Sequence, residues 1–242
     1  MNKENLIYEG KAKQVYCTCN PNQVIIHYKD DATAYNGIKK SIIDNKGILN
    51  NEISSIIYKL LENHGIKTHL IERLNEREQL CEKVDIIKLE VIVRNIVAGS
   101  MAKRLGIKEG TVLDDETYEL CYKNDYFGDP LINEDHALAL KLATKQELNF
   151  IRITSLKINH ILKMIFKEMN INIVDFKLEF GRNEAGEIIL ADEISPDTCR
   201  LWDMETNEKL DKDRFRRDLG NVEGAYKEIL NRFKRNELNV RN

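Results

Sequence analysis

The chain has 242 residues, of which 42% are hydrophobic and 32% are charged. These proportions are typical of a globular protein with a sizeable core, and they exclude an intrinsically disordered chain. The 37 basic and 40 acidic residues leave a formal net charge of −3, which excludes an overall positive field that would attract nucleic acid or anionic lipid.

The first residues do not resemble a signal peptide. Residues 1–5 are polar and lack the apolar stretch of a signal peptide. The apolar run over residues 89–98 is too short to span a bilayer and contains Arg94. We therefore expect a cytoplasmic protein that contacts neither membrane nor nucleic acid.

The first ninety or so residues predict a twisted antiparallel sheet. A helix over residues 50–63 is expected beside it, because apolar side chains recur on one stripe and Gly65 follows the last turn. Short β-rich runs broken by Gly10 and by the Asn20-Pro21-Asn22 segment predict strands. The strands are expected over residues 6–9, 14–19, 24–29, 66–71, 79–87 and 89–97.

The second half predicts long helices around a hairpin. Thr144 and Glu147 have the spacing of a capping box, which opens a helix reaching about residue 169. Two strands, over residues 171–180 and 187–194, enclose a turn that contains Gly181. Helical segments at residues 213–219 and 222–235 complete an α+β layout.

Charged residues concentrate on one face of the strand over residues 173–181. Val174, Phe176, Leu178 and Phe180 alternate onto the apolar face. The opposite face carries Asp175, Lys177 and Glu179. If the hairpin pairs Phe180 with Glu187, then Asp192 lies opposite Asp175, although a slip of one residue would turn Asp192 to the other face.

Two interpretations of this charged face remain open. Cross-strand ion pairs on a solvated face are common in sheets. Carboxylates beside one lysine also suit Mg²⁺, which binds one or two protein carboxylates and keeps positions for phosphate oxygens.

The segment over residues 8–16 predicts a strand, a turn and a second strand. Gly10 would allow the backbone to approach an anion, and Lys11 and Lys13 would hold a polyphosphate. The segment matches neither the P-loop nor the glycine-rich loop of kinases, so from the residues alone an ordinary hairpin is the favoured interpretation.

Two further segments combine arginine with polar side chains. Glu90 and Arg94 share a strand face, and Ser100 would cap a short helix that ends at Gly106, although capping and an ion pair alone explain these residues. Residues 195–203 predict a loop that holds Arg200 beside Asp197 and Asp203. Binding residues favour such loops, but a surface ion pair is the simpler alternative.

Taken together, these segments resemble the SAICAR synthetase family, the phosphoribosylaminoimidazole-succinocarboxamide synthases, over nearly the whole chain. The matching segments are residues 8–16, 30–34, 90–100, 103–106, 173–181, 192–197 and 200–203. The chain departs from the family pattern at Lys88, where relatives often have proline, and at Asn36, where many have aspartate. The second departure leaves the role of position 36 open.

The resemblance implies an antiparallel N-terminal subdomain, placed at residues 1–88, and an α/β subdomain over residues 89–242. The fold would be related to kinase and ATP-grasp folds, with ATP in the cleft between the two parts. We also expect a homodimer.

The resemblance also implies roles for individual residues. The ATP-binding residues would be Lys11, Ala12, Lys13, Val15, Lys123, Glu179 and Asp192. Glu179 and Asp192 would in addition hold Mg²⁺. The substrate-binding residues would be Arg94, Ser100, Asp197 and Arg200, with Asp175 and Lys177 as catalytic residues beside the reacting group.

The implied reaction is the ATP-dependent ligation of L-aspartate to 5-amino-1-(5-phosphoribosyl)imidazole-4-carboxylate (CAIR) in purine biosynthesis. It would give SAICAR, ADP and phosphate through an acyl phosphate. Phosphoryl transfer needs positioning and charge neutralisation more than a protein nucleophile, which fits a site rich in lysine, arginine and carboxylates. A small-molecule kinase that uses Mg²⁺ and ATP, and a regulatory module that binds ATP without turnover, are the alternatives.

Overall fold

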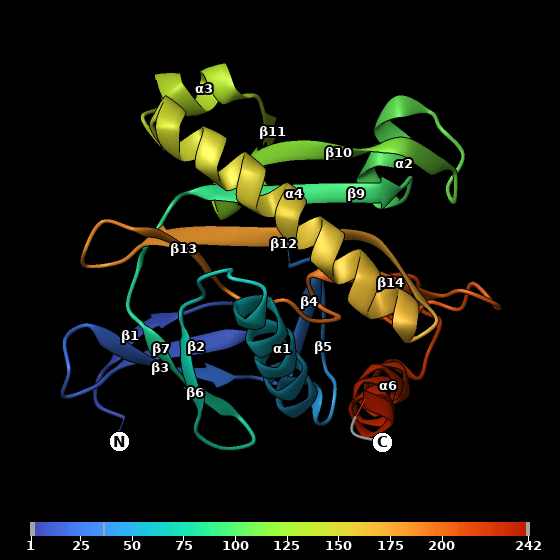
Figure 1. Cartoon of the computed structure of the whole chain (residues 1–242), viewed down its shortest axis with the longest axis horizontal. Coiled ribbons are helices and arrows are strands. Elements are labelled where there is room, and N and C mark those ends of the chain that lie inside the picture. The colour runs from blue at the N-terminus through green and yellow to red at the C-terminus, as the bar shows by residue number, and fades with distance from the viewer. Residues whose placement is uncertain (1–2, 36, 241–242) are drawn as a thin grey trace.

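The computed structural model describes residues 3–35 and 37–240, with side chains as far as Asn236. Asn36, whose role the sequence leaves open, lies outside the described residues. The fold is α+β, as predicted, with two larger sheets one above the other in Figure 1. None of the helices within the described ranges is both long enough and apolar enough to span a membrane.

The N-terminal sheet is antiparallel and is covered by one long helix. Its five strands follow the order β1-β2-β3-β7-β6. In chain order they are β1 Leu6–Glu9, β2 Lys13–Cys17, β3 Gln23–Tyr28, β6 Leu70–Arg73 and β7 Glu78–Glu82. The helix α1, Lys46–Asn63, buries Ile53, Ile57 and Leu61 in the core. This apolar stripe is the one the sequence predicted, but the helix begins four residues earlier, with a first turn in which Lys46, Gly47 and Leu49 are buried.

The long strand β12, Ile171–Arg182, is the central strand of the second sheet. Strands β9, β13, β14 and the short β8 all pair with β12 in antiparallel fashion. The strands of this sheet are β8 Asp85–Ile86, β9 Leu89–Ile96, β10 Val112–Tyr122, β11 Leu131–Ile132, β12, β13 Ile188–Ala191 and β14 Cys199–Asp203.

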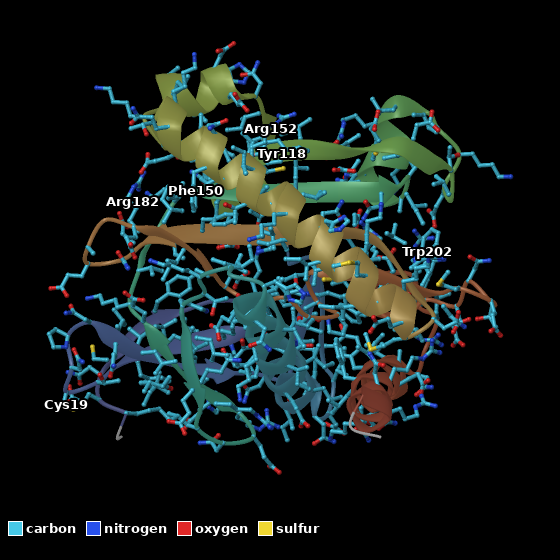
Figure 2. The ribbon with its side chains drawn as sticks, viewed as in Figure 1. Cys19, Tyr118, Phe150, Arg152, Arg182 and Trp202 are labelled. Atoms are coloured by element: carbon cyan, nitrogen blue, oxygen red, sulfur yellow. The ribbon has the colours of Figure 1, made fainter. Side chains whose placement is uncertain are left out.

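Helices cover the second sheet and connect it to the first. The long helix α4, Lys145–Glu168, crosses β9 and β12 (Figure 1). In Figure 2, Arg152 of α4 lies beside Tyr118 of β10, with its guanidinium carbon 4.9 Å from the ring centroid. The remaining elements are the hairpin β4 Asp31–Ala34 and β5 Lys39–Ile42, and the helices α2 Gly99–Leu105, α3 Glu134–Ala139, α5 Asp213–Arg216 and α6 Val222–Val240.

One main core joins the two halves of the molecule. It includes Ile57 of α1, Val91 of β9 and Phe180 of β12. The C-terminal helix α6 packs against α1, so the last part of the chain lies against the first (Figure 1). The strand β8 lies before residue 88 but pairs with β12. The predicted division at residue 88 stays a prediction.

The predicted hairpin register was wrong. Phe180 pairs with Leu190 rather than with Glu187, because the strand continues through Gly181 to Arg182. The sequence interpretation placed Gly181 in the turn, whereas this glycine makes room for a neighbouring strand. A Cβ at Gly181 would lie 2.5 Å from Val84 Cγ2, just before β8.

The capping box at the start of α4 is confirmed. The Thr144 hydroxyl accepts a hydrogen bond from Glu147 N at 3.2 Å, and the Glu147 carboxylate accepts one from Thr144 N at 2.6 Å. Two amide groups that the helix leaves without partners are thereby satisfied.

We expect Thr144→Ala to lower the free energy of unfolding by about 1 kcal/mol, because a cap hydrogen bond is lost. In a chain of this size, that loss corresponds to a melting temperature lower by about 2–4 °C, measurable by circular dichroism. Gln146→Ala, at an exposed position in the same helical turn, is the control and should melt within about 1 °C of the unmodified protein. Equal melting temperatures for Thr144→Ala and the control would contradict the prediction.

Candidate active site

A cleft of about 380 Å³ runs between the β1–β2 turn and the central strands β9 and β12. Its wall carries lysines and carboxylates from several separate segments. Among them are Lys11, Lys13, Lys123 and Lys177, with Glu90, Glu179, Asp192 and Glu193. A second pocket, of about 650 Å³, shares part of this wall and is lined largely by apolar side chains, among them Ile7, Val15, Val24, Ile26 and Val84.

Three lysines and two carboxylates meet where these two pockets join. Lys177 Nζ donates a hydrogen bond to Asp192 Oδ2 at 3.0 Å and another to Glu179. Lys13 Nζ donates to the other oxygen of Asp192. Lys123 Nζ lies 2.8 Å from Glu179 Oε1. We call these five residues the lysine–carboxylate cluster.

The charges of this cluster are maintained by pairing. Burial alone would lower the pKa of Lys13, but Asp192 and Glu193 outweigh burial and raise that pKa well above its ordinary value. The pKa of Lys177 is raised in the same way, against burial, by Asp192, Glu179 and Glu90. Burial would raise the pKa of Asp192, yet Lys13 and Lys177 hold it well below its usual range. Lys13, Lys177 and Asp192 are therefore ionised at neutral pH.

The local backbone explains how the cluster forms. Lys177 and Glu179 are two residues apart on β12 and therefore project to the same face. Asp192 follows the last residue of β13 and has φ of 65°, a left-handed conformation that is uncommon outside glycine. This backbone turn, rather than the predicted register, directs Asp192 towards Lys177.

The β1–β2 turn closes one side of the cleft. Gly10 N donates to Lys13 O at 2.8 Å, and a Cβ at Gly10 would lie 3.1 Å from the Tyr8 ring. Lys11 reaches across the opening to Asp125 at 2.7 Å. Ala12 lines the cleft, and Val15 lines the apolar pocket.

A third pocket, of about 220 Å³, adjoins the cleft and contains the predicted arginines. Arg94 donates to Glu119 through Nε and Nη2, at 3.0 and 2.9 Å, and its Nη2 lies 3.2 Å from Ser100 Oγ. Arg94 Nη1 and Arg200 Nη1 both donate to Asp175 Oδ2, the latter at 2.7 Å. The Asp175 carboxylate thus holds two guanidinium groups side by side. We call this the arginine pocket.

Three predictions about these segments need correction. Glu90 does not pair with Arg94, since its carboxylate lies 3.4 Å from Lys177 Nζ. Ser100 is not a helix cap, because α2 begins at Gly99 without a side-chain cap. Residue 99 is a glycine because Arg200 packs against it: a Cβ there would lie 2.3 Å from Arg200 Nη2. The predicted loop over residues 195–203 is a strand, β14, from Cys199 onwards.

Asp197 lines both the cleft and the arginine pocket. Its carboxylate accepts hydrogen bonds from Lys46 Nζ at 2.8 Å and from Tyr226 Oη at 2.6 Å. Burial opposes ionisation, but Lys212 and Lys46 outweigh it and hold the pKa of Asp197 well below its ordinary value. Asp197 therefore fastens the β13–β14 connection to α1 and α6.

Sequence reasoning did not find the partners of these groups. Lys46, Glu119, Lys212, Arg216 and Tyr226 come from segments that showed no motif. One signal existed: a lysine at the first position of a helix is unfavourable towards the helix dipole, and Lys46 occupies that position in α1. The other residues reach the site only through tertiary packing.

The comparisons with known proteins agree with this geometry. Residues 6–233 match the family model described as SAICAR synthetase. Phosphoribosylaminoimidazole-succinocarboxamide synthase of Fusobacterium nucleatum is 62% identical over 96% of this chain and 98% of its own length. The crystal structure of the synthase from Ehrlichia chaffeensis superposes with a TM-score of 0.93 at 52% identity, covering 95% of this chain and 98% of the other.

A second solved structure is a SAICAR synthetase in complex with ADP. It has a TM-score of 0.91 and 50% identity, and covers 93% of this chain and 96% of its own. The relatives and this chain therefore match over nearly their whole lengths, in sequence as well as in fold. The resemblance noted from the motifs is confirmed, and the chain belongs to the SAICAR synthetase family.

Proposed function

We propose that this protein is a phosphoribosylaminoimidazole-succinocarboxamide synthase. It would use ATP and Mg²⁺ to join L-aspartate to CAIR, forming SAICAR, ADP and phosphate in purine biosynthesis. The main support for this proposal is the position of Lys177, whose side chain lines both the cleft and the arginine pocket. A nucleotide in the cleft and a phosphorylated substrate in the arginine pocket would bring their reacting groups together there.

The cleft and the apolar pocket suit the two parts of a nucleotide. A base fits the apolar pocket beside Val15, while the polyphosphate lies along Lys11, Ala12, Lys13 and Lys123. Lys13, Lys123 and Glu179 line both spaces, so a single ligand can occupy both. The ADP in a relative of 50% identity supports this assignment.

The residues present fit Mg²⁺ bound together with a nucleotide. Within residues 3–35 and 37–240, no group of three or more metal-ligating side chains occurs, which disfavours a metal held by protein alone. Glu179 and Asp192 place hard carboxylate oxygens on the cleft wall, and Mg²⁺ typically needs one or two such groups besides phosphate oxygens. When bound, the ion would neutralise charge on the phosphates.

The arginine pocket suits the ribose phosphate of CAIR. Two guanidinium groups and the Ser100 hydroxyl converge there, and guanidinium is well matched to phosphate. Asp175, predicted to be catalytic, contacts both arginines. We assign it the task of orienting Arg94 and Arg200, with Lys177 beside the reacting carboxylate. Asp197, predicted to bind substrate, would position the β13–β14 connection.

The chemistry follows from this arrangement. A carboxylate oxygen of CAIR attacks the γ-phosphorus of ATP, and ADP leaves. The amine of aspartate then attacks the acyl carbon, the C–N bond forms, phosphate departs, and the nitrogen loses a proton. Lys13, Lys123 and Lys177 would hold the negative oxygens apart from one another and stabilise charge as it moves between them.

We also propose a cytoplasmic homodimer. The biosynthetic role of the family supports the location. Exposed apolar side chains on α4, Phe150 at 45% and Ile153 at 60%, are the candidate surface for pairing (Figure 2).

The direct test of the function measures ADP release. We expect rapid release only when ATP, Mg²⁺, CAIR and L-aspartate are all present. A small-molecule kinase would release ADP at the same rate without aspartate, and a regulatory module would release none. Either of these results would overturn the proposed function.

The acyl-phosphate route predicts the fate of one oxygen atom. We expect ¹⁸O placed in the CAIR carboxylate to appear in the released phosphate, one atom per turnover, because that oxygen bridges to phosphorus. Mass spectrometry of the phosphate provides the measurement. Unlabelled phosphate would contradict the route while leaving the ligase assignment intact.

Glu179→Gln and Asp192→Asn should each lower kcat by about 100-fold or more, because a charge that positions the phosphates is lost. Raising Mg²⁺ should partly restore the rate. Glu187→Gln, on the exposed hairpin turn, is the control and should retain full activity. Full activity with unchanged Mg²⁺ dependence in both cleft variants would remove these residues from the site.

A further inference from the structure

Two cationic side chains lie near the junction of the cleft and the arginine pocket and have no role in the nucleotide and sugar-phosphate assignments above. The cleft and the arginine pocket share Lys177, Asp197, Thr198 and Arg216. Lys212 also lines the cleft. Under the proposed function, this junction is where an amine must reach the activated carboxylate, so the residues around it are candidates for binding the third substrate.

Lys212 is a largely buried ammonium group without a hydrogen bond in the described part of the chain. Its side chain is 13% exposed, and its nearest carboxylate oxygen, Asp197 Oδ2, is 3.6 Å away. The oxygens of Asp197 already accept hydrogen bonds from Lys46 and Tyr226. Burial lowers the pKa of Lys212. A carboxylate from a ligand would supply the hydrogen bonds that this ammonium lacks.

Arg216 lies one helical turn after Lys212 and lines both pockets. Its Nη1 donates to Asp213 Oδ1 at 2.6 Å, which fixes one side of the guanidinium group. No hydrogen bond from Nε or Nη2 is formed with the described residues. A guanidinium group with free donors is suited to a carboxylate, and spacing of four residues places both cations on one face of the segment.

The segment that carries these two cations is held firmly. Tyr35 Oη donates to Arg216 O at 2.8 Å, and Lys39 Nζ donates to Phe215 O at 2.6 Å. The β4–β5 hairpin therefore holds α5 in place through hydrogen bonds. Thr33 and Tyr35 of this hairpin also line the cleft, as do the two cations. A subsite for a small ligand requires such support, because its side chains must be positioned before binding.

The other cations of the two pockets already have partners of their own. Lys13, Lys123 and Lys177 pair with Glu179 and Asp192. Arg94 and Arg200 pair with Asp175. A substrate with two further carboxylates needs two further cations to bind them. Among the described residues, Lys212 and Arg216 lie at the junction and have hydrogen-bond donors that no protein acceptor uses.

We propose that Lys212 and Arg216 bind the two carboxylates of the amino-dicarboxylate substrate and direct its amine towards Lys177 and Thr198. The proposal rests on the proposed function, since it assigns a subsite to L-aspartate in that reaction. It makes Lys212 and Arg216 the residues that select a dicarboxylate over other amino acids.

The test uses Lys212→Gln and Arg216→Gln, with Arg217→Gln as the matched control. Arg217 is the next residue along the chain but pairs with Glu109 at 2.8 Å and lines neither pocket. We expect each subsite variant to raise the KM for aspartate by about 10- to 100-fold, because a charge-assisted hydrogen bond is lost. The KM values for ATP and CAIR should stay within about twofold, and the control should leave all three unchanged.

Succinate provides a second measurement that does not depend on turnover of aspartate. It carries both carboxylates but no amine, so it should compete with aspartate in the unmodified protein. In both subsite variants its inhibition constant should rise in parallel with the KM for aspartate. Circular dichroism melting verifies that each variant is folded. If the Arg216→Gln protein is unstable, Arg216→Lys replaces it and should recover only part of the succinate binding of the unmodified protein.

The outcomes distinguish this inference from the function on which it rests. If the unmodified protein releases ADP without aspartate, the proposed function fails. If turnover requires aspartate but the variants keep the unmodified KM and succinate inhibition, only the subsite is overturned. Equal losses for all three substrates would show that α5 serves the fold and would likewise overturn the assignment.

Discussion

The structure depends on keeping like charges apart inside a cleft whose charged side chains are largely or partly buried. Lys13, Lys123 and Lys177 are held by Glu179 and Asp192. Glu179 lies on β12 and Asp192 directly follows β13 in the second sheet, while Lys13 comes from β2 of the first. Losing either carboxylate leaves partly buried ammonium groups uncompensated, which is far more costly than losing a surface pair. The ion pairs therefore bind the two sheets together and set the positions of the groups that would meet a nucleotide.

The same logic extends to the arginine pocket, where carboxylates again hold cationic groups. Asp175 stands between Arg94 and Arg200, and Glu119 and Asp213 hold their outer sides. Each guanidinium group keeps a fixed plane, which forked recognition of a phosphate requires. The two sites differ in geometry, since lysines act as point charges around a polyphosphate and arginines as flat donors. The lysine–carboxylate cluster and the arginine pocket meet at Lys177.

The sequence predicted the parts of the site that depend on short-range periodicity. Alternation along β12 placed Lys177 and Glu179 on one face, and the structure has them there. It failed for Asp192, whose direction depends on a left-handed backbone and on where the turn begins. Tyr226 and Arg216 could not be predicted, since only the packing of α5 and α6 brings Tyr226 to Asp197 and Arg216 to the cleft.

The contact of Asp197 with both ends of the molecule has a consequence for biosynthesis. Lys46 is synthesised well before Tyr226, yet both side chains donate hydrogen bonds to the Asp197 carboxylate. During translation, the N-terminal sheet and α1 can form while the Lys46 ammonium still lacks its buried partner. The junction between the two pockets closes only after α6 has emerged and docked on α1. The groups that meet at Asp197 can therefore assemble only after the segment that carries Tyr226 has been synthesised.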